Sequence, residues 1–151
     1  MDTKIDFKNP EFYENRELSW IKFDNRVLSE ARDKSIPLLE RLKFVSITSS
    51  NLDEFFMVRV ASLLDMVHAN YKKRDIAGMT ATEQLAAINK ETRELVDTQY
   101  STYTRSLVPL LNKEGIYLVD EHETLTDEQA AFVDRYFMES VYPVLTPMAV
   151  D

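Results

Sequence analysis

The sequence contains no cysteine, two glycines and five prolines among its 151 residues. Without cysteine it can form neither a disulfide framework nor a thiolate metal site. Two glycines are too few for a glycine-rich phosphate-binding loop, so a P-loop and a dinucleotide-binding fingerprint are both excluded. The scarcity of glycine and proline together also disfavours a turn-rich β-sandwich or barrel.

Long apolar runs are also missing. Residues 1–10 carry charges between isolated apolar residues, unlike the apolar core of a signal peptide. No other stretch has the length and apolar character of a membrane span. We therefore expect a protein with no transmembrane segment that resides in the cytoplasm.

Basic residues are in the minority, with 18 Lys and Arg against 26 Asp and Glu and a net charge of −8. Affinity for a polyanion comes largely from clustered Lys and Arg that neutralise its phosphates. The only basic run, Lys72-Lys73-Arg74, follows a helical pattern, where cations complement the dipole at a helix C-terminus. We expect no nucleic acid as a partner.

Apolar residues make up 44% of the sequence, enough for a real core, and they recur at helical spacing. The first helix is predicted to begin at Ser19, as N-cap, and to end at residues 35–37. Pro37 suits the first turn of a second helix. The polar cluster at residues 48–51 is predicted to break that second helix.

Further helices are predicted from two capping-box patterns, in which a polar cap is followed three residues later by Glu. Asn51 with Glu54 opens a third helix, and Thr80 with Glu83 opens a long fourth one. Residues 71–79 indicate the connection between them.

Proline and glycine predict how the fourth helix ends and where the next element begins. Pro109 should interrupt the helix near Arg105, because proline lacks the backbone donor and clashes with the preceding turn. Gly115 marks the stop, and Ile116–Val119 is a short strand candidate.

Thr126 with Gln129 caps a last helix. The apolar terminus after it, residues 141–150, needs a partner. These features indicate a strand and a helix that open a truncated α/β domain.

The predicted fold class is therefore mainly α, a bundle of about four helices over residues 16–107. Residues 1–15 form a lead-in, and residues 108–151 are the truncated start of a second domain. The side chains expected to be buried together in the core are Trp20, Phe23, Leu28, Leu42, Phe55, Val58 and Leu95.

Two stretches of this sequence resemble the polyphosphate kinase family, in the family's own order. The first is Arg-Glu-Leu-Ser-Trp at residues 16–20, and the second is the run 36–61, where a polar hinge separates two apolar stretches. The resemblance is close over residues 16–61 and looser over 107–151. Residues 62–106 match only as a helical pattern.

That family reversibly transfers the terminal phosphate of ATP to polyphosphate, and its members are several hundred residues long. The resemblance therefore identifies this chain as an N-terminal piece, without catalysis of its own and without a cofactor of its own. It implies ATP, ADP and polyphosphate as ligands of the full-length enzyme. Magnesium and a phosphorylated histidine belong to domains further along, to which this piece would dock, and a homo-oligomer is left open.

The resemblance aligns Asn51 with an asparagine that contacts ATP, in a domain that covers the adenine end of the nucleotide. A helix N-terminus would add free backbone donors, and an amide side chain can both donate and accept. Asp53 and Glu54 would repel a triphosphate, which favours contact with the base or the ribose. Without the resemblance, Asn51 is more simply a helix cap.

We expect the other charged residues and the two histidines to have structural roles. Arg59 lies in an apolar helix and must find a partner, for which an internal ion pair is favoured. Asp53 and Glu54 are adjacent, so they cannot face each other as an acid and base pair, and we expect them to complement a helix dipole. His68 and His122 have no companion at ligand spacing, so neither a metal site nor a phosphohistidine is expected.

Aromatic residues leave two interpretations open. A stacking platform for a base would use Trp20, Phe23, Phe44, Phe55 and Phe56, whereas aromatics at helical spacing more often form a core. Composition alone favours a different function class, a helical module that binds protein partners and no nucleotide. A purely structural lid is the third alternative.

Overall fold

The computed structural model describes residues 6–149, which are helical or irregular and include no strand. The chain divides into two compact units, one up to Gly115 and one from Ile116 onward. The mainly helical class is confirmed. The domain limits expected from the sequence, 16–107 and 108–151, stay predictions.

In the described part of the first unit, the first helical element is a 3-10 turn at Pro10–Phe12, and helix α1 follows from Arg16 to Arg32. Asn15 caps α1, because its side-chain oxygen accepts two backbone N–H groups of the first turn at 3.0 Å each. The prediction of Ser19 as the cap was wrong. Ser19 is an exposed residue within the helix, and Asn15 meets the need for a cap one turn earlier.

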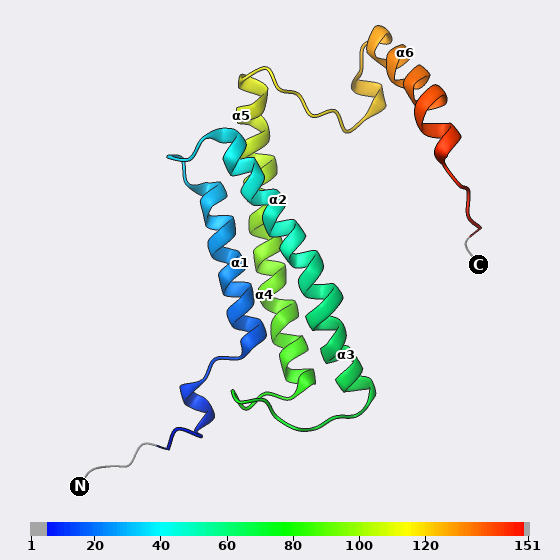
Figure 1. Cartoon of the computed structure of the whole chain (residues 1–151). Helices are drawn as coiled ribbons and strands as arrows, with labels where there is room; N and C mark the ends of the chain where they lie inside the picture. The colour runs from blue at the N-terminus through cyan, green and yellow to red at the C-terminus, as the bar shows by residue number, and fades with distance from the viewer. Residues whose placement is uncertain (1–5, 150–151) are drawn as a thin grey trace. The chain divides into compact units, whose positions relative to one another are not determined.

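A single helical run extends from Leu38 to His68 (Figure 1). It consists of α2 (Leu38–Glu54), a π-helical turn (Phe55–Val60) and α3 (Ala61–His68). The predicted break at residues 48–51 was therefore wrong, and so was the capping box at Asn51.

Two side chains of the polar cluster form hydrogen bonds that are compatible with a continuous helix. The Thr48 hydroxyl donates to the carbonyl of Phe44 one turn back, at 3.0 Å. The Asn51 side chain bonds to α1 instead of capping its own backbone. Asp53 and Glu54 consequently lie at the C-terminal end of α2 and do not complement a helix N-terminus, which corrects that expectation.

Helix α4 spans Ala81–Thr102 and begins at the predicted capping box of Thr80 and Glu83. A π-helical turn, Tyr103–Leu107, and a short helix α5, Val108–Lys113, continue it. Pro109 lies at the start of α5 and cannot donate to residue 105, so the predicted interruption is confirmed as a π-helical turn. Gly115 comes after α5 with a φ of +77°, a conformation that suits glycine at a helix end.

The core lies where α1 packs against α2 and where α4 packs against α1 and α3 (Figure 1). Its buried apolar side chains are Ile21, Leu28, Ala31, Leu52, Phe55, Val60, Leu63, Ala81, Ile88 and Leu95. Of the predicted core, Leu28, Phe55 and Leu95 are buried and Trp20 and Leu42 are partly buried. Phe23 and Val58 are 45% and 58% exposed, so those two predictions were wrong.

Among residues 116–149 the second unit has one α-helix, α6 from Asp127 to Tyr136, which begins at the predicted capping box of Thr126 and Gln129. A π-helical turn (Phe137–Val141) and a 3-10 turn (Tyr142–Val144) continue it. Residues 116–119 are irregular, and no strand pairs with them within 6–149. The strand prediction is therefore not met here, and the α/β domain stays a prediction.

Candidate functional site

Three side-chain pairs join α1 to the helical run of α2 and α3. The pairs are Glu17–Arg59, Trp20–Phe55 and Asp24–Asn51. The members on α1 are spaced by three and four residues, and the members on the facing run by four, so each set lies on one helix face. Their order reverses between the two helices, as antiparallel neighbours require.

The Asp24–Asn51 pair joins a buried carboxyl to a partly buried amide. Asp24 is fully buried in α1, and Asn51 Nδ2 donates to its Oδ1 at 2.8 Å. The other carboxyl oxygen, Asp24 Oδ2, is buried and has no hydrogen-bond partner in the described part of the chain. Burial raises the pKa of the Asp24 carboxyl, and the bond from Asn51 offsets part of that rise.

The carboxyl determines which way the Asn51 amide points. An ionised carboxylate only accepts hydrogen bonds, so the amide NH₂ group must face it. Asn51 Oδ1 has no donor among the side chains and backbone groups of residues 6–149, and it is not among the atoms buried without a partner. This oxygen therefore stays accessible as an acceptor.

The backbone of Asn51 offers nothing to a ligand. Asn51 lies within α2, so the free N–H groups expected of a helix N-terminus are not present at this position. Asp53 and Glu54 are exposed nearby in sequence and bring negative charge to this end of α2. The arrangement suits a neutral hydrogen-bond donor of a ligand better than a phosphate.

The aromatic rings that join α1 to the facing helical run contact other side chains of the protein. Trp20 and Phe55 stack with ring centroids 4.4 Å apart and planes 6° from parallel, and Phe55 is buried. Arg59 pairs with Glu17 at 3.0 Å, which confirms the predicted internal ion pair, and its guanidinium carbon lies 5.9 Å from the centre of the Trp20 ring. The stacking-platform interpretation is wrong for Phe55, because both of its faces are enclosed.

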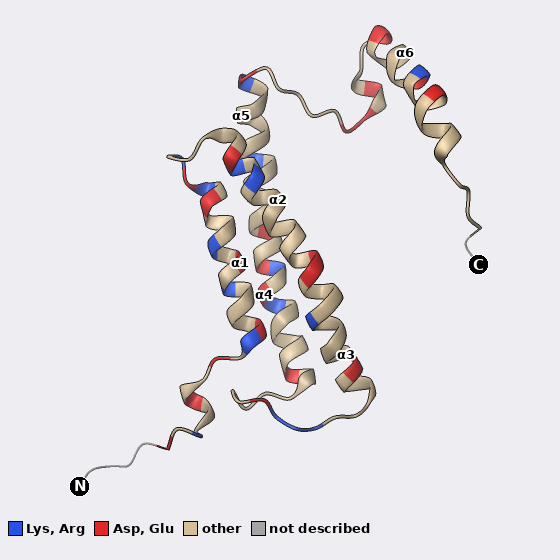
Figure 2. Ribbon diagram, in the orientation of Figure 1, with Lys and Arg blue, Asp and Glu red and all other residues tan. Residues whose placement is uncertain are grey.

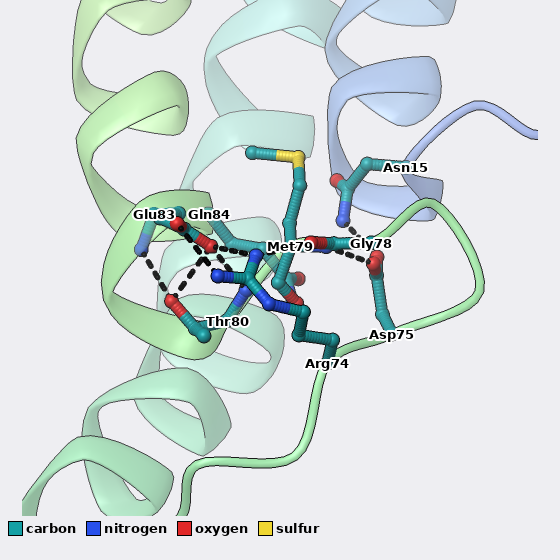
Figure 3. A network of polar contacts seen from close by, with 8 residues as sticks. All are labelled: Asn15, Arg74, Asp75, Gly78, Met79, Thr80, Glu83 and Gln84. Atoms are coloured by element: carbon teal, nitrogen blue, oxygen red, sulfur yellow. Dashed lines mark hydrogen bonds and ion pairs between the residues drawn. The ribbon is translucent and has the colours of Figure 1, made fainter. Parts of the chain in front are cut away.

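The connection between α3 and α4 is held by a polar network (Figure 3). Asp75 accepts from the Asn15 side chain and from the backbone N–H of Met79, both at 2.7 Å. Arg74 pairs with Glu83 at 2.8 Å, and it also donates to the carbonyl of Gly78. The network ties the loop to the start of α1 and to the capping box of α4.

This network corrects the interpretation of the basic run at residues 72–74. The run begins beyond the last turn of α3, where the dipole of that helix has little effect. Arg74 instead neutralises the capping carboxylate of α4, and hydrogen bonds from Thr80 and Arg74 lower the pKa of Glu83. Elsewhere, basic and acidic residues are interspersed along the helices of the first unit (Figure 2).

A groove between α2 and α4 is a separate feature of the first unit. Its lining residues are Leu42, Val45, Ser46, Ser49, Gln99, Tyr100 and Tyr103. Neither Asp24 nor Asn51 belongs to it.

Neither histidine is a member of the three pairs, the loop network or the groove. His68 is exposed at the end of α3, and His122 Nε2 lies 3.1 Å from Asp134 Oδ1 on the surface of the second unit. Within the described residues there is no group of three or more His, Cys, Asp or Glu side chains placed to hold a metal ion. Nor does any helix there have the length and apolar character needed to cross a bilayer.

Comparison with known proteins decides the family. The family described as the polyphosphate kinase N-terminal domain matches residues 13–119. This chain belongs to the polyphosphate kinase family. Polyphosphate kinase of Lactiplantibacillus plantarum is 52% identical over 147 residues, which cover 97% of this chain and 20% of that protein. The Halalkalibacterium halodurans polyphosphate kinase is 51% identical over 148 residues, again 97% of this chain, and 21% of that protein.

A solved structure agrees with the sequence comparison. The crystal structure of polyphosphate kinase from Porphyromonas gingivalis matches with a TM-score of 0.73 and 33% identity, over 89% of this chain and 19% of that one. The chain thus spans about a fifth of the length of the polyphosphate kinases it matches.

Sequence reasoning identified Asn51 and Arg59 in this N-terminal domain but missed Asp24. A signal was present: Asp24 occupies a helical stripe whose other members are Ile21, Leu28 and Ala31, all of them apolar and buried. A carboxyl at such a position needs a partner, because a buried charge without one is costly. That partner is Asn51.

Proposed function

We propose that the polyphosphate kinase containing this domain reversibly transfers the terminal phosphate of ATP to polyphosphate, and that the domain supplies Asn51 to the adenine side of the ATP site. Family membership supports the first part. The accessible Oδ1 of Asn51, held in place by the buried Asp24, supports the second. Magnesium and the phosphorylated histidine belong to the other domains of the enzyme, which acts in the cytoplasm.

Asn51 acts in this proposal by binding alone. Its amide oxygen accepts a hydrogen bond from the exocyclic amino group of adenine or from a ribose hydroxyl. Neither donor changes its charge during phosphoryl transfer, so the bond has the same strength in the ground state and in the transition state. Its loss therefore raises the KM for ATP and leaves kcat unchanged.

The test uses the full-length enzyme with Asn51→Ala. The KM for ATP should rise by about fivefold, the factor that corresponds to one hydrogen bond of about 1 kcal/mol, and kcat should be unchanged. Ser50→Ala is the matched control, because Ser50 is the exposed neighbour on the same helix. An unchanged KM in a variant that unfolds at the wild-type temperature would contradict the proposal.

A second, compatible role is docking to the remaining domains. An apolar set of exposed residues lies along the run of α2 and α3: Ile47, Phe56, Met57, Val58, Leu64 and Met66. The matching polyphosphate kinases are about five times as long as this chain, so they contain ample surface to cover it.

Met57 is 71% exposed. Met57→Asp should therefore leave the separate domain stable but lower the thermal stability of the full-length enzyme, whereas a module that binds only external proteins predicts no such loss.

A further inference from the structure

Asp24 is an unfavourable residue for its surroundings. It is fully buried in a stripe of apolar residues, and Oδ2 has no partner among residues 6–149. A buried polar atom without a hydrogen bond costs stability, so an apolar side chain of similar size would pack at this position at lower cost. The one contact that requires a carboxyl here is the bond from Asn51 at 2.8 Å.

We propose that Asp24 is a positioning residue that locks the Asn51 amide with its oxygen toward the nucleotide and so selects adenine over guanine. This inference rests on the proposed contact between Asn51 and ATP. Asp24 does not touch the ligand, and the base preference depends on the orientation of the Asn51 amide.

The base preference results from the two ends of the amide. A free asparagine can turn by half a rotation and present either its NH₂ group or its oxygen, at similar cost. Beside Asp24 only the NH₂ group can face the carboxylate, so the ligand meets the oxygen. Adenine carries an amino donor at the position where guanine carries a carbonyl acceptor. The oxygen of Asn51 therefore bonds adenine and repels guanine.

The orientation of the amide depends on the ionised form of Asp24. A carboxylate only accepts hydrogen bonds, so it holds Asn51 Nδ2 toward Oδ1. A protonated carboxyl has one O–H donor as well as an acceptor, so it accommodates the Asn51 amide in either orientation.

The test measures kcat/KM for ATP and for GTP in the full-length enzyme, as wild type and with Asp24→Asn. An amide at residue 24 has the same shape, but it can donate as well as accept, so the Asn51 amide is free to turn. The preference for ATP over GTP should fall by about fivefold or more, the factor for one hydrogen bond, with kcat for ATP unchanged.

A reciprocal variant separates positioning from a packing effect. Asp24→Asn combined with Asn51→Asp restores one donor and one acceptor in opposite places, and residue 51 again offers only oxygen to the ligand. ATP preference should recover in this double variant relative to Asp24→Asn alone. Recovery would not occur if Asp24 acted only through the stability of the fold. Thermal unfolding of each variant is measured alongside.

The outcomes distinguish this inference from the proposed function. If Asn51→Ala leaves the KM for ATP unchanged, the ATP contact itself fails. If Asn51→Ala raises the KM but Asp24→Asn keeps the base preference, only the positioning role of Asp24 is overturned. Equal use of ATP and GTP by the wild-type enzyme overturns it as well, and that measurement requires no variant to fold.

Discussion

Trp20 of α1 lies flat on Phe55, with ring centroids 4.4 Å apart and ring planes 6° from parallel. One polar pair lies on each side of this stack along the two helices. Because the stack is the middle contact of the three, it holds α1 at the separation at which both polar pairs form. The candidate ATP contact at Asn51 therefore depends on an aromatic contact one helical turn away.

Phe55→Ala should destabilise the first unit by about 3–5 kcal/mol, because it empties a fully enclosed aromatic site. Phe56→Ala is the matched control, since the adjacent ring is 43% exposed, and it should cost less than half as much. Urea unfolding followed by the fluorescence of Trp20, the single tryptophan, measures both. Equal losses for the two variants would show that the stack has no special role.

The Glu17–Arg59 pair should show a measurable coupling energy. The two side chains are 14% and 28% exposed, so solvent screens their attraction less than at an open surface. A double-mutant cycle with Glu17→Gln and Arg59→Met should give a coupling of about 1 kcal/mol in unfolding free energy.

The Glu40–Lys43 pair provides the comparison on the same helical run. Its side chains are 50% and 61% exposed, so the same kind of cycle should give a coupling of about 0.5 kcal/mol or less. The same coupling for both pairs would mean that burial does not strengthen the Glu17–Arg59 pair.

The separate chain of residues 1–151 should transfer no phosphate from ATP to polyphosphate. One amide contact cannot offset the entropy of immobilising ATP. The separate chain should therefore bind ATP with a dissociation constant of about 1 mM or weaker. Isothermal titration with ATP and an assay of polymer synthesis measure both quantities. Synthesis of polyphosphate by the purified chain, free of full-length enzyme, would refute the assignment of catalysis to the other domains.

Helix starts in this protein were predictable where a cap is local. Thr80 with Glu83 and Thr126 with Gln129 form the boxes that their spacing predicts, because all the partners lie within one turn. Asn51 with Glu54 has the same spacing and forms no box. Its amide has a stronger alternative in the buried carboxyl of Asp24, which lies 27 residues earlier and is brought close only by the packing of α1 on α2.

The same distinction limits what was predictable about the site. The position of Arg59 in an apolar stretch predicted that its charge has a partner. Sequence spacing alone does not identify Glu17 as that partner. Asn51 was found through family resemblance, and its position inside a helix was not foreseen. Local patterns thus predicted which residues need contacts, whereas the antiparallel pairing of two helices determines which contacts they make.

Asp24 should make the free energy of unfolding of the first unit depend on pH. Burial raises the pKa of its carboxyl in the folded state above the ordinary aspartate value of about 4. Between the unfolded and the folded pKa the folded state binds more protons, so the contribution of Asp24 to stability falls as pH rises through this window and stays low above it. Asp24→Asn removes the ionisation and keeps an acceptor for Asn51. The variant should therefore gain stability relative to wild type at neutral pH, and the gain should shrink as pH falls toward the ordinary aspartate pKa.

Urea unfolding at a series of pH values measures the difference, with Asp53→Asn on the exposed side of α2 as the comparison. A stability difference between wild type and Asp24→Asn that stays constant with pH would mean that Asp24 titrates alike in the folded and unfolded chain, and that its burial has no electrostatic cost.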